Sequence, residues 1–370
     1  MLLEDSLLYA LIFCGVVQLF YAFYYFLPLA YHPDSWDGGQ ERPVSVLVCA
    51  HNELENLRRL VPALLAQEYP LFELVLVDDR STDGTGAYLQ ALAREHAQIK
   101  TVRVDETPAG LSPKKYGLTQ GVRLARHPFL LFTDADCLAE SPKWIREMQN
   151  GFQNGAELVL GYSSYSKTFG FLNGLIRYET LLTAIQYLSF AKRGQPYMGV
   201  GRNLAYTKHC FYRNQGFSSH ITSTGGDDDL FVRDAVAHSK AAIVISKDAQ
   251  TQSIPKRTYR EWIFQKKRHL SAGLQYRIFD KIKIGAFILS NVLFYVIGLT
   301  LLFTQAHLLF LGLIFGGRCL IVFFVYCLVA RRLKENLSVL RLPLVDLVYF
   351  LHYMLLGVFV LFLKKEVKWK

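Results

Sequence analysis

The sequence is short of charged residues and of paired cysteines. Charged residues make up 19% of its 370 residues and hydrophobic residues 51%, a composition that argues against intrinsic disorder, collagen and coiled coil. None of the six cysteines forms a Cys-x-x-Cys pair, and three of them lie in apolar stretches. Neither a zinc site nor a disulfide framework is therefore expected, and reduced cytoplasmic thiols are the default.

The common phosphate-binding motifs are also missing. There is no Walker lysine loop, and Asp83-Gly-Thr-Gly86 is not a G-x-G-x-x-G fingerprint. The chain is nevertheless basic, since 41 Lys and Arg against 31 Asp and Glu give a net charge of +10. Such a balance favours a nucleic acid, an anionic membrane surface or a phosphorylated ligand as partner.

Apolar residues concentrate in four long stretches near the two ends of the chain. The stretches are 7–29, 284–304, 306–330 and 344–363, and the third contains Arg318. Each reaches the ~20 residues that cross a hydrocarbon core. A buried core helix is the alternative for any one of them, but their clustering around a polar middle indicates a multi-pass membrane protein.

The first stretch does not resemble a secretory signal. Glu4 and Asp5 precede it without any Lys or Arg, and no A-x-A site follows. We read it as an anchor with its N-terminus outside, which places the basic middle, 34–283, in the cytoplasm. The basic clusters at 331–334 and 364–370 both favour the cytoplasm, so the last stretch is re-entrant or one boundary is misplaced.

The middle of the chain alternates short β-rich runs with helical patterns. This alternation predicts an α/β domain built on a parallel sheet. The expected strands are 44–50, 74–77, 101–104 and 129–132, and the expected helices are 53–67, 84–96 and 113–126.

Polar residues follow three of these strands at the point where each ends. They are His51-Asn-Glu53, Asp78-Asp-Arg-Ser81 and Thr133-Asp-Ala-Asp136. One acidic strand end is commonly a helix cap or turn, as Ser81 and Asp83 could be. Three at one sheet edge indicate a ligand site, because ligands of such sheets bind beyond the carboxyl ends of the strands.

Two acidic groups stand out for chemistry. Alternate residues leaving a strand can turn Asp134 and Asp136 toward one ligand, and two hard oxygen ligands suit Mg²⁺ or Mn²⁺. A metal there could neutralise a diphosphate leaving group. The run Gly225-Gly-Asp-Asp-Asp-Leu230 is either a solvated helix N-terminus or a source of a general base with a raised pKa.

These motifs, followed by Gln265-Lys-Lys-Arg-His269, stand in an order that resembles the membrane-bound members of glycosyltransferase family 2, over about 44–270. Cellulose, chitin and hyaluronan synthases belong to this group. The resemblance implies an α/β glycosyltransferase A (Rossmann-like) domain flanked by transmembrane helices. It implies an anchor at 1–33, a catalytic domain at 34–255, a basic interfacial segment at 256–283 and a transmembrane region at 284–370.

The resemblance also implies residue roles. Asp228 matches the general base of the family, with Asp227 as the fallback, and Asp136 with Asp134 would hold Mg²⁺ or Mn²⁺. Donor binding is implied for Ala50, Asn52, Glu53, Asp78, Asp79, Lys114, Asp134, Asp136, Gln265 and Arg268. Acceptor binding is implied for Gly201, Arg202, Asn203 and His269. Gly117 stands where the lysine motif of the family usually has Ala.

The segment 256–269 fits two roles, which can hold together: to bind the donor diphosphate and acceptor, as the resemblance implies, and to lie as a basic helix at a membrane surface. His269 stands where processive synthases have the Trp of their Q-x-x-R-W motif, which puts processivity in doubt. Basic and aromatic residues interleave here, a composition that suits an anionic membrane surface. Nucleic acid is a poorer partner, because the segment abuts a membrane span. Residues 168–193 predict either an amphipathic helix at the membrane or a core helix.

We therefore expect an inverting, metal-dependent hexosyltransferase of the cell membrane that faces the cytoplasm. Its donor would be a nucleotide-diphosphate sugar, UDP- before GDP-linked, and its acceptor a lipid-linked molecule or a glycan. One alternative is a processive polysaccharide synthase. An alternative of another class is a non-catalytic membrane scaffold or transporter subunit that binds nucleotide sugars.

Overall fold

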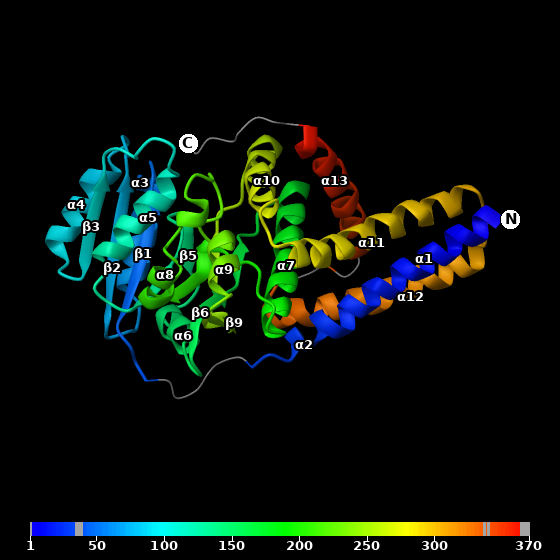
Figure 1. Cartoon of the computed structure of the whole chain (residues 1–370), viewed down its shortest axis with the longest axis horizontal. Coiled ribbons are helices and arrows are strands. Elements are labelled where there is room, and N and C mark those ends of the chain that lie inside the picture. The colour runs from blue at the N-terminus through cyan, green and yellow to red at the C-terminus, as the bar shows by residue number, and fades with distance from the viewer. Residues whose placement is uncertain (1, 34–39, 336–337, 339–340, 363–370) are drawn as a thin grey trace. The chain divides into compact units, whose positions relative to one another are not determined.

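The computed structural model describes residues 2–33, 40–335, 338 and 341–362, which fall into two compact units (Figure 1). The first, here the sheet unit, comprises the described residues of 33–177 and 190–275. The second, here the helical unit, comprises those of 2–32, 178–189 and 276–362. Helix α7 (Phe171–Lys192) contributes residues to both units.

A seven-stranded sheet in the order β3-β2-β1-β4-β8-β6-β9 forms the centre of the sheet unit. Strands β3, β2, β1 and β4 are parallel, whereas β8 is antiparallel to both β4 and β6. The sheet is thus mixed, and the predicted parallel order holds for its first four strands. The bounds are β1 (Val44–Ala50), β2 (Phe72–Asp79), β3 (Ile99–Val104), β4 (Phe129–Phe132), β6 (Ala156–Gly161), β8 (Leu204–Thr207) and β9 (Lys240–Val244).

Helices cover both faces of the central strands, which is why β1 and β2 are almost continuously apolar. Alternate residues of a strand face opposite sides. Val46 and Leu74 join the core beneath the apolar stripe of α3, whereas Leu47 and Val77 lie against α5. The helices are α3 (Leu54–Leu65), α4 (Thr85–Glu95), α5 (Pro113–Leu124), α6 (Trp144–Asn150), α8 (Lys208–Arg213), α9 (Asp229–Ala235) and α10 (Tyr259–Gly273).

Two glycines let α5 approach the sheet closely. A Cβ at Gly121 would lie 2.9 Å from Cγ2 of Val77, and one at Gly117 would lie 3.2 Å from Sγ of Cys49. The replacement of Ala by Gly117 is therefore explained by packing. Close packing of α5 on the sheet carries the start of the helix, with Lys114, to the sheet edge.

A small second sheet follows the order β5-β10-β7. Its strands are β5 (Cys137–Ala139), β7 (Ser163–Tyr165) and β10 (Thr251–Ser253). Strand β10 is antiparallel to β5 and parallel to β7. Because β5 begins directly after Asp136, this sheet lies beside the predicted metal site.

The helical unit contains α1 (Leu2–Phe20), the π-helix η1 (Tyr21–Phe26), α2 (Leu27–Ala30), α11 (Ile278–Phe303), α12 (Leu308–Arg332) and α13 (Leu342–Phe362). Three helical stretches are long and apolar enough to cross a membrane, namely Leu3–Ala30, Ile278–Phe303 and Leu308–Arg332. The fourth predicted span falls on α13, whose searched apolar part, Leu342–Leu356, is shorter. Residue 363 and the basic cluster at 364–370 lie outside the described residues.

A buried polar cluster joins four helices of the helical unit. Arg318 of α12 is 3% exposed and pairs with Asp346 of α13, which is 0% exposed, at 3.0 Å. The guanidinium also donates to Gln18 of α1 at 2.6 Å and to Asn291 of α11 at 2.7 Å. Arg318 is therefore a paired residue that ties the bundle together, which reconciles its charge with an apolar stretch.

Candidate active site

The predicted polar strand ends meet at one edge of the large sheet. Strands β1, β2 and β4 are parallel, so the residues that follow them share an edge. The loops after β1 and β2 are hydrogen-bonded, because Asn52 N donates to Ser81 Oγ at 2.9 Å and Thr82 N donates to Asn52 Oδ1 at 2.8 Å. The sequence therefore identified a real cluster, and the bonds between its loops hold its geometry.

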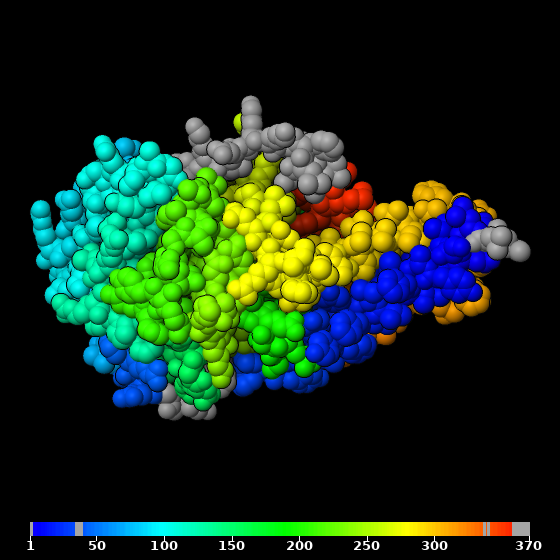
Figure 2. Space-filling view, in the orientation of Figure 1, coloured from blue at the N-terminus to red at the C-terminus, as the bar shows by residue number. Residues whose placement is uncertain are grey.

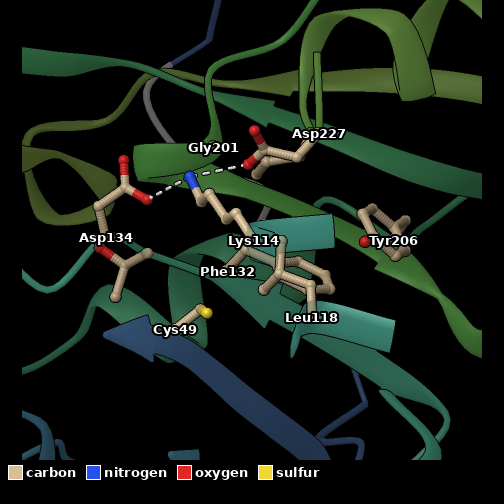
Figure 3. Close-up of a pocket in the computed structure, with 10 residues that line it drawn as sticks. Cys49, Lys114, Leu118, Phe132, Asp134, Gly201, Tyr206 and Asp227 are labelled. Carbon is tan, nitrogen blue, oxygen red and sulfur yellow. Dashed lines mark hydrogen bonds and ion pairs between the residues drawn. The ribbon is translucent and has the colours of Figure 1, made fainter. Parts of the chain in front are cut away.

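Lys114 links the two predicted acidic groups. Its Nζ lies 2.9 Å from Oδ1 of Asp134 and 2.8 Å from Oδ2 of Asp227 (Figure 3). These residues line a small pocket, open to solvent, that Phe132 and Tyr206 also border. Burial alone would lower the pKa of Lys114, but the charges of Asp134 and Asp227 outweigh it and raise that pKa well above its usual value.

The carboxylates after β4 have the composition of a divalent-cation site. Asp134, Asp136 and Cys137 each offer a ligand atom, and these atoms lie within 4.8 Å of one another. Burial raises the pKa of Asp136, and the charge of the neighbouring Asp134 raises it further. A bound cation would relieve the repulsion between the two carboxylates. Burial raises the pKa of the Cys137 thiol well above its usual value, so the two carboxylates are the fitting ligands for Mg²⁺ or Mn²⁺.

Asp228 caps the N-terminus of α9. Its Oδ1 accepts from the backbone N–H of Asp229 at 2.8 Å, and its Oδ2 accepts from that of Gly201 at 2.7 Å. Burial, and next the charge of Asp227, raise the pKa of Asp228. Burial would also raise the pKa of Asp227, but its ion pair with Lys114 outweighs burial and lowers it. The two neighbours therefore differ, and Asp228 is the better proton acceptor.

Comparison with known proteins agrees with this geometry. Residues 45–213 match the family described as Glycosyl transferase family 2. The chain contains a family 2 glycosyltransferase domain. The matched segment begins in β1 and ends with α8, so it includes Lys114, Asp134 and Asp136.

Individual relatives are distant. Glycosyltransferase AglE of Haloferax volcanii is 27% identical over 193 residues, which are 50% of this chain and 58% of AglE. The beta-monoglucosyldiacylglycerol synthase of Nostoc sp. is 34% identical over 26% of this chain and 21% of its own. A poly-beta-1,6-N-acetyl-D-glucosamine synthase of Staphylococcus epidermidis is 25% identical over 27% and 23%. The chain thus covers less than two thirds of the length of each of these relatives.

A solved structure shows the same fold. The chain is similar to a mannosyltransferase of Pyrobaculum calidifontis, solved in complex with GDP-Man and Mn²⁺, with a TM-score of 0.63 and 19% identity. The match covers 98% of this chain and 100% of the other. The predicted glycosyltransferase A-type α/β fold is confirmed.

Three of the predicted donor-binding residues lie at the expected edge, but they are buried or bonded to other protein groups. Asp79 is 1% exposed and accepts from Nε of Arg80 at 2.8 Å. Asp78 is 3% exposed and accepts from Nη1 of Arg103 at 3.1 Å. Ala50 is buried in the core, so only its backbone is available to a nucleoside.

Glu53 is electrostatically coupled to the carboxylates of the candidate metal site. Its backbone N–H donates to Thr85 Oγ1 at 3.1 Å, and its carboxylate accepts from Asn56 Nδ2. Burial raises the pKa of Glu53, and the charges of Asp136 and Asp134 raise it further. The pKa of Glu53 therefore depends on Asp134 and Asp136, which the sequence order alone did not indicate.

One acceptor prediction needs correction. Asn203 is 0% exposed, its Oδ1 accepts from Trp144 Nε1 at 3.0 Å, and its Nδ2 donates to the carbonyls of Tyr162 and Ala249 at 2.8 and 2.7 Å. These three bonds use both donors of the buried amide and one of the two lone pairs of its oxygen. Asn203 is therefore a structural residue that fixes the 3₁₀ turn η2 (Gly201–Asn203), and the prediction that it contacts an acceptor is wrong for its side chain.

Arg202 and Gln265 meet on a residue that the sequence analysis did not single out. The guanidinium of Arg202 lies 4.4 Å from the ring centroid of Tyr165, and Gln265 Nε2 donates to the Tyr165 hydroxyl at 3.1 Å. Arg268 packs against Gly225, where an added Cβ would lie 3.3 Å from Cγ of Arg268. His269 is exposed. Three predicted residues of two motifs thus gather around β7 and the start of the acidic run.

Lys115 is a further residue that the sequence analysis missed. Its side chain is 0% exposed, and Nζ donates to the carbonyls of His220, Ser223 and Gly225 at 2.6, 3.0 and 2.6 Å. Burial lowers the pKa of Lys115 to about 8. One helical step separates Lys114 and Lys115, so they point about 100° apart, one into the site and the other into the loop that leads to the acidic run.

Proposed function

We propose that this protein is an inverting hexosyltransferase of the membrane that moves a sugar from a nucleotide-diphosphate donor to a lipid-linked or glycan acceptor. The observation that carries the proposal is the bridge from Asp134 through Lys114 to Asp227. It puts the predicted donor-phosphate side and the predicted acceptor side within reach of one ammonium group. A degenerate scaffold has no need to keep this charged arrangement.

Asp228 is the proposed general base. Its raised pKa suits a carboxylate that takes the acceptor hydroxyl proton as the oxygen attacks the anomeric carbon. One attack in line displaces the nucleotide diphosphate from the opposite face and inverts the configuration. Asp227 holds Lys114 and does not compete for the proton, because the ion pair keeps it ionised.

Asp134 and Asp136 would hold Mg²⁺ or Mn²⁺. A bound cation supplies Lewis-acid stabilisation of charge on the departing diphosphate. Lys114 and Arg268 supply the remaining positive charge to the leaving group, Lys114 as a point charge and Arg268 as a fork of donors. The relative solved with GDP-Man and Mn²⁺ supports a metal-dependent reaction.

The donor base is the most open part of the proposal. We place UDP-sugars first, as the resemblance to the synthases implies, and GDP-mannose second because of the mannosyltransferase of similar fold. The donor side would consist of Asn52, Glu53, Asp78 and Asp79, with Gln265 and Arg268 closing over the phosphates.

For the acceptor we favour single addition to a lipid-linked molecule at the cytoplasmic face. The glycolipid synthase among the relatives supports it. The polysaccharide synthase supports the processive alternative, which His269 disfavours because it lacks an indole to stack on the sugar. The proposed layout keeps an anchor at 1–33, a catalytic part at 34–255, an interfacial segment at 256–283 and a membrane region at 284–370.

The test is donor hydrolysis and transfer by the detergent-purified full chain. UDP- and GDP-sugars are assayed with Mn²⁺ or Mg²⁺, with and without a polyprenyl-phosphate or diacylglycerol acceptor. We expect metal-dependent release of one nucleotide diphosphate, lost in Asp136→Asn and retained in the matched control Asp248→Asn, which lies on the short turn η4 (Lys247–Ala249). Equal turnover in Asp136→Asn and in the wild type would refute the site. Products longer than one added sugar would favour the processive alternative.

A further inference from the structure

A second depression of the sheet unit lies beside the candidate metal site. Asp136 lines it, together with Arg59 of α3 and Ser253 of β10. Asp134, by contrast, lines the pocket that also contains Lys114 (Figure 3). The two candidate metal ligands therefore border different depressions, and the contacts of Lys114 account only for the first.

Arg59 brings a positive charge to the second depression. Its side chain is exposed, and among the residues that the structure describes no carboxylate forms an ion pair with it. The neighbouring Arg58 is exposed too, but it pairs with Glu55 at 2.8 Å and does not line the depression. Consecutive residues of a helix point about 100° apart. Arg59 is thus the arginine of this pair that is available to a ligand.

A second guanidinium adjoins the depression. Nη1 of Arg202 donates to Ser253 Oγ at 3.2 Å, and the guanidinium carbon lies 4.4 Å from the ring centroid of Tyr165. Gln265 donates to the Tyr165 hydroxyl from helix α10, part of which lies at the surface (yellow in Figure 2). Within the described part of the chain, no carboxylate forms an ion pair with Arg202 either. Two guanidinium groups without a paired carboxylate therefore adjoin one depression.

The backbone of Arg202 is fixed and lies beside the proposed general base. Its carbonyl accepts from Thr133 Oγ1 at 3.1 Å and from Thr251 Oγ1 at 3.0 Å. The preceding residue, Gly201, donates its N–H to Oδ2 of Asp228 at 2.7 Å. A ligand bound by Arg202 therefore lies on the side of the site where the acceptor hydroxyl would lose its proton.

We propose that the second depression is a phosphate subsite for the acceptor, held by Arg59 and Arg202. The planar fork of a guanidinium donates two parallel hydrogen bonds to phosphate oxygens. A cation bound by Asp134 and Asp136 would offset their negative charges, which would otherwise repel a phosphate. A neutral acceptor such as diacylglycerol would leave both guanidinium groups without an anion.

The phosphate belongs to the acceptor rather than to the donor, an inference that rests on the proposed function. There, Lys114 and Arg268 neutralise the donor diphosphate, and Asp228 takes a proton from an acceptor hydroxyl. An acceptor that reaches from Asp228 to Arg202 carries its reacting hydroxyl close to a phosphate, as a phosphoglycerol headgroup does. A phosphate oxygen that attacked the donor itself would be ionised already at neutral pH and would not need Asp228.

The test measures binding and needs no turnover. Glycerol phosphate, and glycerol as a neutral probe, are titrated by calorimetry into the detergent-purified full chain. Mn²⁺ and a saturating nucleoside diphosphate are present, so that the position of the donor phosphates is filled. The variants are Arg59→Gln and Arg202→Gln. The matched control is Arg58→Gln, which removes the neighbouring exposed arginine of the same helix.

We expect Arg59→Gln and Arg202→Gln each to weaken the binding of glycerol phosphate by at least about tenfold, because hydrogen bonds to charged groups contribute that much. Arg202→Lys, which keeps the charge but not the fork, should recover part of the loss. Arg58→Gln should bind glycerol phosphate as the wild type does. None of the variants should change the binding of glycerol.

Unchanged binding of glycerol phosphate in Arg59→Gln would overturn the subsite, and this variant alters an exposed side chain, so a failure to fold is not expected to obscure the result. Failure of the wild type to bind glycerol phosphate would overturn it as well. Displacement of glycerol phosphate by the nucleoside diphosphate would assign the anion to the donor and overturn the assignment to the acceptor. Loss of nucleoside diphosphate binding with glycerol phosphate still bound through Arg59 would instead count against the proposed function.

Discussion

Lys114 should restrain metal binding, and its removal gives the sharpest test of the site. The cation would be held by Asp134 and Asp136, and the Lys114 ammonium already forms an ion pair with Asp134 at 2.9 Å. The Lys114 side chain is only 13% exposed. In Lys114→Met the carboxylate is released and the positive neighbour is gone. We expect the variant to bind Mn²⁺ more tightly than the wild type, although it transfers sugar more slowly.

The size of the effect follows from the charges. A single positive charge repels a divalent cation about 5 Å away by about 1.7 kcal/mol even at a water-like dielectric of about 80. This corresponds to about seventeenfold in the dissociation constant of Mn²⁺. A lower dielectric constant in a site that excludes water would enlarge this effect on Mn²⁺ binding. Protonation of the freed carboxylates would reduce it, so the comparison belongs at neutral pH or above.

Mn²⁺ binding is measured by electron paramagnetic resonance of the free ion, with and without a nucleoside diphosphate. In the wild type the diphosphate should tighten Mn²⁺ binding, because it draws Lys114 away from Asp134; in Lys114→Met this gain should shrink. Metal and diphosphate must strengthen each other equally, which offers an internal check. Lys240→Met, at an exposed lysine of β9, is the matched control. Unchanged or weaker Mn²⁺ binding in Lys114→Met, with the control unaffected, would refute the reasoning.

Three other predictions follow from named contacts. Asp228→Asn should lower kcat by at least about a hundredfold with little change in nucleotide binding; in the wild type, the raised pKa of Asp228 predicts that activity is lost, as pH falls, at a higher pH than an ordinary carboxylate would cause. Lys115 has a pKa of about 8 in the folded chain against 10.5 for an unperturbed lysine. Between pH 8 and 10.5 the unfolded chain therefore binds more protons, so thermal stability should not fall as pH rises, whereas activity should fall because deprotonated Lys115 loses one hydrogen bond to its loop. Lys115→Arg should move this loss of activity to higher pH, and a pH–activity profile identical to that of the wild type would contradict the role of Lys115 in holding the loop. Arg318→Met should destabilise the detergent-solubilised protein by about 3–5 kcal/mol by stranding Asp346, and Arg318→Met with Asp346→Asn should recover part of it; equal melting temperatures of single variant and wild type would exclude the cluster as a stabilising element.

Local signals in the sequence account for most of the fold around the site. The runs at 44–50 and 129–132 coincide with β1 and β4, because nearly continuous apolar residues suit a strand that is covered on both faces. The strands after Phe132 were not predicted. They are short, and β8 and β6 pair antiparallel or out of sequence order, so their partners depend on residues far along the chain.

In the membrane region, too, the local sequence predicted the helices but not their long-range contacts. Length and apolarity predicted four spans, and among the described residues three helices are long and apolar enough to cross a membrane. They could not show that Arg318 has a partner. That partner, Asp346, is 28 residues away on another helix. In the sequence, Arg318 only interrupts an apolar stretch, and the structure shows that Asp346 balances its charge.

The sequence by itself identified the candidate residues of the site, because strand ends, acidic runs and their order are local features. Only the tertiary structure decided which partner each of these residues has. Asp227 and Asp228 are identical and adjacent, yet one pairs with Lys114 and the other caps α9. Lys114 and Lys115 are equally alike, yet one faces the site and the other holds a loop. The reason is physical: pKa and hydrogen bonding depend on distance and burial, and both are set by side chains that the fold brings together from distant parts of the chain.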